Sequence, residues 1–295
     1  AVVRARLAAN SQPHTDLTPR EVQLSRGLVD NLMLMCVQQR SIVGAASGHV
    51  AATLVLSRQL QLSARWFATG MILGGIGAFI LSVNLATISE WLDYAGQEIL
   101  IATIMLAVLG LLTLIGLYST SALWASRHSL PYLMSICVAL ALSREGAEIV
   151  IYLGGILNHQ ESVQPTFTGA GIGAGIGLSA GVLLYFGLLS LPARWIFCTC
   201  ILLLALIGGT MASQATLLLT QVDWVAYSPV LWDSSIWLPE DSIPGHLLYA
   251  LVGYEATPSL FQAIAYGIGF LLVSISATLG YLNHFRSRRK NTGEK

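Results

Sequence analysis

Charged residues are scarce in this chain. They make up 10% of its 295 residues, against about 25% in soluble domains, and 15 basic residues balance 15 acidic ones. So few charges cannot cover a protein of this length with a water-facing surface, which excludes a cytosolic enzyme and a disordered chain. Because the net charge is zero, no polyanion partner is expected, and in particular no nucleic acid.

Cysteine and reactive side-chain pairs are also scarce. The cysteines all fall in apolar stretches, which indicates neither a disulfide framework nor a zinc site: Cys36, Cys137, Cys198 and Cys200. Cys198 and Cys200 fall on different faces of a helix, which favours packing over metal binding. No nucleophile is paired with a base and no histidine pair has metal-ligand spacing. The sequence therefore does not indicate an enzyme, and no resident cofactor is expected.

Long apolar segments are what the chain has instead. Apolar residues make up 55% of it and the mean hydropathy is +0.68. Because a membrane span needs about 20 mostly apolar residues, the sequence predicts an all-α polytopic membrane protein with seven spans. The predicted spans are Asn31–Leu56, Ala64–Val83, Ile99–Tyr118, Leu130–Leu157, Gly169–Leu191, Trp195–Thr220 and Leu260–Leu282.

The predicted organisation is a polar N-terminal tail (1–27), a seven-span membrane domain (28–285) and a basic tail (286–295). The N-terminal tail lacks an apolar core, so we do not expect a signal peptide there. The segment from Gln221 to Ser259 is the longest loop, and loops of that length are usually functional or disordered. Tryptophans at span ends and in loops predict anchoring at the membrane interface.

The sign of the loop charges alternates along the chain. Basic residues follow the odd spans: Arg58, Arg65, Arg127, Arg194, Arg286, Arg288, Arg289, Lys290 and Lys295. Acidic residues follow the even spans: Glu90, Asp93, Glu98, Glu161, Asp223, Asp233, Glu240, Asp241 and Glu255. The positive-inside rule then predicts a multi-pass protein of the cell (plasma or inner) membrane with its N-terminus outside and its C-terminus in the cytoplasm.

Small residues predict where helices pack closely. Gly70, Gly74, Gly75 and Gly77 occur in the second span, and a glycine-rich run from Gly169 to Gly181 occurs in the fifth. The run superficially matches a phosphate-binding loop, but no strand precedes it and no lysine lies nearby. Close helix packing is therefore the favoured interpretation of both sets.

Four charged residues fall at membrane depth: Arg40, Arg144, Glu145 and Glu148. Placing a charged side chain at the centre of a membrane helix costs about 2.5–3.5 kcal/mol, so such residues are candidates for a functional role. Glu145 and Glu148 are three residues apart, so both project from one helix face, and Gly146 and Ala147 between them leave room for a neighbouring helix. Paired carboxylates suit a hard cation.

A structural interpretation of the same residues stays open. Arg144 and Glu148 are four residues apart on a helix, so they can neutralise each other. Glu145 would then be protonated and hydrogen-bonded to a neighbouring span. Against this interpretation, two acids on one face exceed what a single arginine can balance.

The pentapeptide Arg144–Glu148 (Arg-Glu-Gly-x-Glu) resembles the signature of the high-affinity iron permease family. A second stretch agrees, from Gly245-His246-Leu247-Leu248 through Gly253–Ser259 to Gln262 and Tyr266. The resemblance implies two inverted three-helix repeats plus a last span, with the motif on spans 1 and 4. It also implies iron, in the ferric form, as the substrate, with Glu145 and Glu148 as its ligands and Arg144 orienting Glu148 or lowering the pKa of the pair.

The first copy of the family's motif is absent from this chain. The corresponding register places Gln38, Gln39 and Arg40 where the carboxylates should stand, and no acid occurs between Asp30 and Glu90. Amide oxygens of Gln38 and Gln39 are weaker ligands for a hard trivalent ion, and Arg40 would repel it. Three explanations stay open: iron transport with a reduced site, transport of another ion or of protons, or loss of transport.

The family also implies a partner that oxidises or hands over iron, such as a ferroxidase or an exported iron-binding protein. Glu90, Asp93 and Glu255 are the candidate external residues that receive the ion. The rival hypothesis is a non-transporting membrane subunit or degenerate paralogue that binds a partner through its external acidic loops.

Overall fold

The computed structural model describes residues 50–60, 62–63, 65–90, 95–120, 124–157, 163–240 and 242–293. Their regular structure is helical, and the one pairing of extended backbone among them is an isolated bridge between Val230 and Ser259. The helices are α3 (Arg65–Ser89), α4 (Gly96–Thr120), α5 (Trp124–Leu157), α6 (Val163–Leu189), α7 (Ala193–Gln221), α8 (Ile243–Val252) and α9 (Leu260–Gly293). Residues 50–59 are helical as well. The prediction of an all-α protein is confirmed for the described part of the chain.

Five of these helices contain a segment long and apolar enough to cross a membrane. The segments are Arg65–Asn84, Gly96–Ser119, Phe167–Leu189, Trp195–Gln221 and Leu260–Leu282. They agree within a few residues with five of the predicted spans. The predicted span Leu130–Leu157 lies inside the charged helix α5, which is not among the five, and Asn31–Leu56 lies mostly outside the described residues. The seven-span arrangement as inverted repeats therefore stays a prediction.

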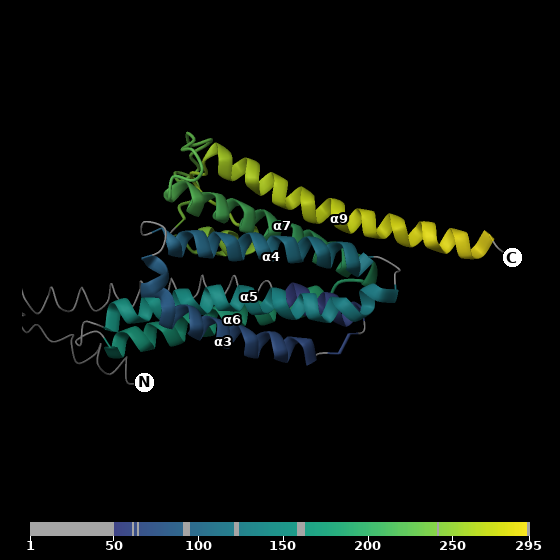
Figure 1. Ribbon diagram of the computed structural model, residues 1–295, viewed down its shortest axis with the longest axis horizontal. Coiled ribbons are helices and arrows are strands. Elements are labelled where there is room, and N and C mark those ends of the chain that lie inside the picture. Colours follow the sequence, from purple (N-terminus) through teal and green to yellow (C-terminus); the bar gives the residue numbers. More distant parts are fainter. Residues whose placement is uncertain are drawn as a thin grey trace, which may run out of the picture.

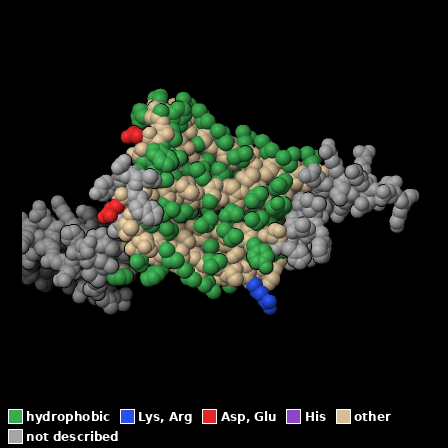
Figure 2. Space-filling model, viewed as in Figure 1, with side chains coloured by type: hydrophobic (Ala, Val, Ile, Leu, Met, Phe, Trp, Pro, Cys, Tyr) green, Lys and Arg blue, Asp and Glu red, His purple; other side chains and the backbone are tan. Residues whose placement is uncertain are grey.

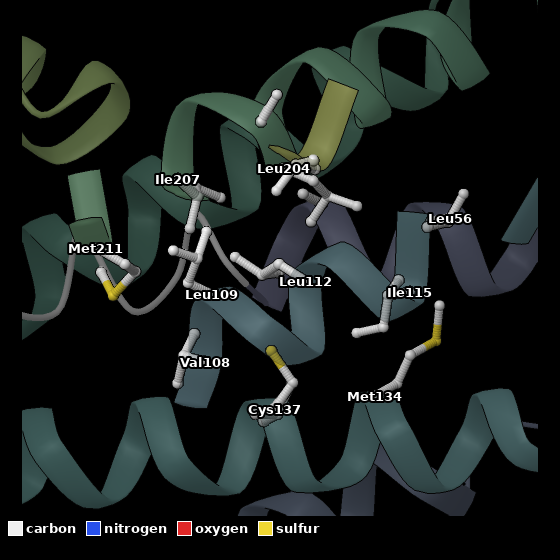
Figure 3. Packing of buried hydrophobic residues seen from close by; sticks show 14 of the residues in the cluster. Leu56, Val108, Leu109, Leu112, Ile115, Met134, Cys137, Leu204, Ile207 and Met211 are labelled. Atoms are coloured by element: carbon white, nitrogen blue, oxygen red, sulfur yellow. The ribbon is translucent and has the colours of Figure 1, made fainter. Parts of the chain in front are cut away.

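The helices form two groups that meet at α4 and α5. Helices α4, α7 and α9 pack against one another, α3 packs along α5, and α4 contacts α5 (Figure 1). A hydrophobic core lies between the groups and includes Leu112 of α4, Met134 and Cys137 of α5 and Leu204 of α7 (Figure 3). Most of the large apolar side chains that remain exposed lie on α3, α6 and α9, as expected for helices in contact with lipid.

The charges of the described residues are separated along the bundle. Acidic side chains lie at the end where α3 ends and α4 begins, and a basic side chain marks the opposite end (Figure 2). The flank between the two ends is mostly apolar. This separation agrees with the alternating loop charges of the sequence.

Close packing of α3 against α5 depends on particular glycines. A Cβ atom at Gly74 would lie 2.7 Å from Cβ of Leu142, and one at Gly77 would meet the hydroxyl of Ser143. At Gly75, between them, a Cβ atom would have no atom of another described element within 4 Å. The predicted role in packing is therefore confirmed at Gly74 and Gly77 and is wrong at Gly75, because successive residues of a helix point in different directions.

The glycine-rich run in α6 divides in the same way. Gly169, Gly173, Gly177 and Gly181 recur every four residues on one helix face and are buried. Gly171 and Gly175 lie on the other face, with no atom near the position of a Cβ. One side of the run is thus a close-packing face, as the sequence predicts, and the other is open.

Trp66 differs from the other tryptophans of the described residues. Its side chain is 4% exposed and belongs to the core, whereas Trp195 and Trp237 are 57% and 90% exposed. Trp66 begins α3, the position expected of an interfacial anchor, but its ring turns inward and packs edge-on against Phe67 with centroids 6.0 Å apart. Interface anchoring therefore does not explain Trp66.

Candidate functional site

The three charged residues of α5 form one cluster centred on Arg144. Its Nη1 atom lies 3.1 Å from Oε1 of Glu145, and its Nη2 atom lies 2.8 Å from Oε1 of Glu148. The side chains are 13%, 9% and 28% exposed for Arg144, Glu145 and Glu148. One guanidinium therefore bridges two carboxylates, and with all three groups ionised the cluster carries a formal charge of −1.

The opposite side of the same helix is fixed by α3. A Cβ atom at Gly146 would lie 2.6 Å from Cβ of Ala78, so the two helices touch there. Ser143 adds a hydrogen bond from its hydroxyl to the carbonyl of Gly74, at 3.2 Å. This contact between small residues matches the prediction that Gly146 lets a neighbouring helix come close, and it fixes the rotation of α5 about its axis.

A cavity of about 510 Å³ lies beside the cluster. Helices α4, α5, α7 and α8 and the segment leading into α9 form its wall, which consists of Ile101, Met105, Arg144, Glu148, Gln214, Leu217, Leu218, Glu240, Tyr249, Glu255, Thr257 and Gln262. Three carboxylates and one guanidinium face it, so its formal charge is −2 when all are ionised. Glu148 thus shares a cavity with Glu240 and Glu255, two acids of the long loop, whereas Glu145 does not line it.

The loop that carries Glu240 and Glu255 is held by side-chain hydrogen bonds. Oε1 of Glu240 accepts the backbone N–H of Ala256 at 2.6 Å, and Oε2 of Glu255 accepts Nε2 of Gln262 at 2.6 Å. Burial raises the pKa of Glu255 above its ordinary value, and the nearby charge of Glu240 raises it further, against the opposing effect of the Gln262 hydrogen bond. The two loop acids are therefore ordered groups with a fixed position at the cavity.

Helix α8 completes this wall, and it was not predicted from the sequence. The hydroxyl of Ser242 caps its start by accepting the N–H of Gly245 at 3.1 Å. Gly253 ends it with φ +70°, a left-handed conformation that favours glycine. Tyr249 is thereby placed on the cavity wall, where its hydroxyl accepts a hydrogen bond from Nε2 of Gln214 at 2.6 Å.

The remaining candidate residues lie elsewhere. Glu90 is exposed just after the end of α3 and does not line the cavity. Asp93, Gln38 and Gln39 lie outside the described residues, as does Arg40. Among the residues that the structure describes, no three His, Cys, Asp or Glu side chains form a group that could hold a metal ion by themselves.

Two residues of the cavity wall were missed by sequence reasoning. Both are uncharged: Gln214 lies in an apolar span and Tyr249 in the segment predicted to be a loop, and neither has a spacing that would single it out. Cys198 and Cys200 are exposed and buried respectively, which confirms that they lie on different faces of α7.

A bundle of apolar helices with a charged cluster in its interior is typical of a multi-pass membrane protein with a functional site among its helices. The chain belongs to the iron permease FTR1 family, whose characteristic sequence it matches over residues 121–283. The match contains α5 with the whole Arg144–Glu148 cluster and ends within α9, at residue 283. The family is one of membrane iron permeases.

Similar proteins are known from two bacteria. An uncharacterized protein of Synechocystis sp. is 34% identical over 156 residues, which cover 46% of this chain and 49% of that protein. An uncharacterized protein of Mycobacterium tuberculosis is 27% identical over 152 residues, which cover 48% of this chain and 35% of that protein. The chain thus matches half or less of the length of these relatives. No solved structure matches it significantly.

Proposed function

We propose that the protein imports iron, as ferric ion, through the cavity beside α5. The carboxylates that bind it are Glu148, on the cavity wall, and Glu145, which does not line the cavity and is joined to Glu148 through Arg144. The observation that carries this proposal is the position of Glu148, which shares a cavity of about 510 Å³ with Glu240 and Glu255. The carboxylates on α5 and on the loop between α7 and α9 attract a multivalent cation, and their oxygen atoms are ligands that suit a hard ion. Glu255 is then the external residue that receives the ion.

The bridging position of Arg144 supports a site of limited affinity. Both carboxylates are already paired through Oε1, so an arriving cation competes with the guanidinium for them. A path must release its ion as well as bind it, and weak binding at several places favours movement. In this proposal the first motif, replaced by Gln38, Gln39 and Arg40, contributes no carboxylate, and the protein carries iron with a reduced site.

The direction of transport follows from the proposed orientation. With the acidic end outside and the basic end in the cytoplasm, the cavity opens toward the external side, in a protein of the plasma or inner membrane. A ferroxidase or an exported iron-binding protein that delivers ferric ion would approach this end.

The alternative function is that of a non-transporting membrane subunit or degenerate paralogue. The same ion pairs favour it, because Arg144 satisfies both acids without any cargo. The loop between α7 and α9 would then bind a partner protein through its exposed side chains, among them Ile236 at 87% and Trp237 at 90% exposure.

Iron uptake by cells that lack their own iron permeases separates the two functions. Radiolabelled iron is supplied as ferric ion and, with a reductant, as ferrous ion, to cells with the protein and to cells with an empty vector. The proposal expects uptake above the vector control, with ferric ion preferred when a multicopper oxidase is co-expressed. Protein present in the membrane without uptake under any of these conditions would favour the alternative.

A further inference from the structure

Helix α9 is longer than the membrane span that it contains. The helix has 34 residues, Leu260–Gly293, whereas its apolar segment has 23, Leu260–Leu282. At about 1.5 Å per residue that segment is roughly 34 Å long, enough to cross a hydrocarbon core of roughly 30 Å. Residues 283–293 continue the same helix for roughly 16 Å more, past the ends of α4 and α7 (Figure 1).

The continuation is strongly basic. It contains Arg286, Arg288, Arg289 and Lys290 and no acid. Along the helix axis Arg286 lies roughly 6 Å and Lys290 roughly 12 Å beyond Leu282. The headgroup layer of a bilayer extends roughly 5–8 Å beyond each side of the hydrocarbon core. With Leu282 at the edge of that core, the basic turn of the helix begins within the headgroup layer.

One face of α9 is turned away from the bundle along the whole span. Large apolar side chains that are 49–54% exposed recur on it every three or four residues: Ile264, Ile268, Leu271, Ile275, Leu279 and Leu282. On the opposite side Val273, Ser276 and Ala277 are buried, where α9 packs against α4 and α7. The exposed face is therefore the one that contacts lipid.

The basic residues continue the register of the lipid-facing side. Steps of three or four residues from Leu282 lead to Arg286 and then to Arg289 and Lys290. The same steps from the buried Ala277 lead through positions without lysine or arginine: Gly280, His284, Ser287 and Asn291. The positive charge thus follows the side of α9 that faces lipid and avoids the side that faces the bundle.

A purely topological role explains the sign of these charges but not their register. The positive-inside rule counts lysine and arginine near the end of a span, whichever helix face they fall on. The described acids lie at the opposite end of the bundle or inside it, and the described residues at this end include the basic Arg58 and Arg65. An anion that pairs with the end of α9 therefore comes from outside the described part of the chain, and the lipid-facing register points to the membrane.

We propose that the basic end of α9 binds the headgroups of anionic phospholipids, with Arg286, Arg289 and Lys290 supplying the positive charge. Arginine suits a lipid phosphate because it can form two parallel hydrogen bonds to it, and lysine contributes a point charge. Each basic residue just beyond a membrane span raises the affinity for an anionic membrane roughly fivefold. Arg288 falls between the two sides of the helix and is not part of the site.

This site is separate from the proposed path of the cation. The cavity beside α5 includes residues of the loop that precedes α9, whereas the basic residues lie at the other end of α9. Lipid binding can therefore be tested whether or not the protein transports iron.

Lipid binding to the purified full-length protein tests the proposal. Native mass spectrometry in detergent measures the affinity of the tightest bound lipid, for anionic phosphatidylglycerol and for zwitterionic phosphatidylcholine. The native protein should prefer phosphatidylglycerol by roughly 100-fold. Arg286→Gln combined with Arg289→Gln and Lys290→Gln should abolish this preference, and Arg289→Gln alone should reduce it roughly fivefold, with phosphatidylcholine binding unchanged.

A charge-matched variant separates the effect of register from that of charge. Arg289→Asn combined with Asn291→Arg keeps the composition and the net charge of the helix and moves one arginine to the bundle-facing register. It should bind phosphatidylglycerol roughly fivefold more weakly than the native protein, as Arg289→Gln does. Asn291→Gln alone should behave as native. Native affinity in the charge-matched variant would contradict the lipid-facing arrangement.

Two controls identify the ligand and exclude misfolding. Inorganic phosphate and glycerophosphoglycerol, the soluble headgroup, should not displace the lipid at millimolar concentration; displacement would show a site for free phosphate groups instead. The melting temperature without added lipid should be the same in all variants, because the substituted residues lie past the ends of the neighbouring helices. If the triple variant melts lower, Arg289→Gln and the charge-matched variant decide. Native-like preference for phosphatidylglycerol in a folded triple variant, or no preference in the native protein, would overturn the inference.

Discussion

Replacing Arg144 by glutamine should destabilise the protein strongly. The substitution removes the guanidinium that lies 3.1 Å from Glu145 and 2.8 Å from Glu148. At such distances each pair has a gross attraction of about 5 kcal/mol for an effective dielectric constant near 20. Desolvation of the guanidinium offsets much of that attraction, and breaking a buried ion pair by removing one partner costs about 3–5 kcal/mol.

That loss is a large part of a typical stability of about 5–15 kcal/mol. The assay is unfolding of the purified protein in mild detergent titrated with a denaturing detergent, together with the amount of protein in the membrane. Arg144→Gln should unfold at a much lower midpoint than the native protein.

The decisive comparison is a variant in which all three groups are neutral. Arg144→Gln combined with Glu145→Gln and Glu148→Gln keeps similar side-chain volumes and leaves no buried charge unpaired. It should recover most of the lost stability, because neutral residues often replace a buried ion pair at little cost. If the triple variant is as unstable as Arg144→Gln, or if Arg144→Gln is as stable as native, the electrostatic reasoning is refuted.

Two further predictions concern packing and the loop. Gly74→Ala should lower the free energy of unfolding by about 1–3 kcal/mol, since its Cβ would lie 2.7 Å from Cβ of Leu142. Gly75→Ala, whose Cβ would have no atom of another described element within 4 Å, should change it by less than about 1 kcal/mol. Equal melting temperatures of the two variants would contradict this prediction. Burial and Glu240 raise the pKa of Glu255, so the folded protein holds this proton more tightly than the unfolded chain does. Its contribution to stability is then greatest at low pH and is lost as the pH rises through the raised pKa. The melting temperature of the native protein should therefore fall relative to that of Glu255→Gln between pH 4 and pH 8, and parallel curves would count against the burial of this carboxyl group.

The sequence predicts the charged part of the site because charge is costly in a membrane. Arg144, Glu145 and Glu148 stand out among apolar neighbours, and their helical spacing predicts the ion pair between Arg144 and Glu148 that the structure has at 2.8 Å. The additional pair with Glu145 follows from tertiary burial, which spacing alone does not determine. One arginine thus serves both acids.

Helix α8 shows a local signal that was present and not used. Ser242, with a proline in the first turn that follows, is a helix start, and Gly253 is a helix stop. The length of the loop from Gln221 to Ser259 favoured an irregular or disordered segment instead. The caps define a ten-residue helix, which places Tyr249 beside the cavity.

The cavity itself could not be derived from the sequence. It depends on how α4, α5, α7 and α8 meet, and its uncharged members Gln214 and Tyr249 have no sequence neighbours that mark them. Glu255 was chosen as an external acid from the loop charges and the family resemblance, and only its tertiary position shows that it shares a cavity with Glu148. Glu90, chosen on the same ground, is exposed away from that cavity.

The most direct test of the account is radiolabelled iron uptake by the native protein and by the Glu145→Gln, Glu148→Gln double variant. Both are expressed at matched membrane levels in cells that lack their own iron permeases. The account predicts uptake by the native protein and none by the double variant, because the variant has no carboxylate left on α5 to bind the ion. Equal uptake by the two would show that iron does not depend on this acidic pair, and would contradict the account.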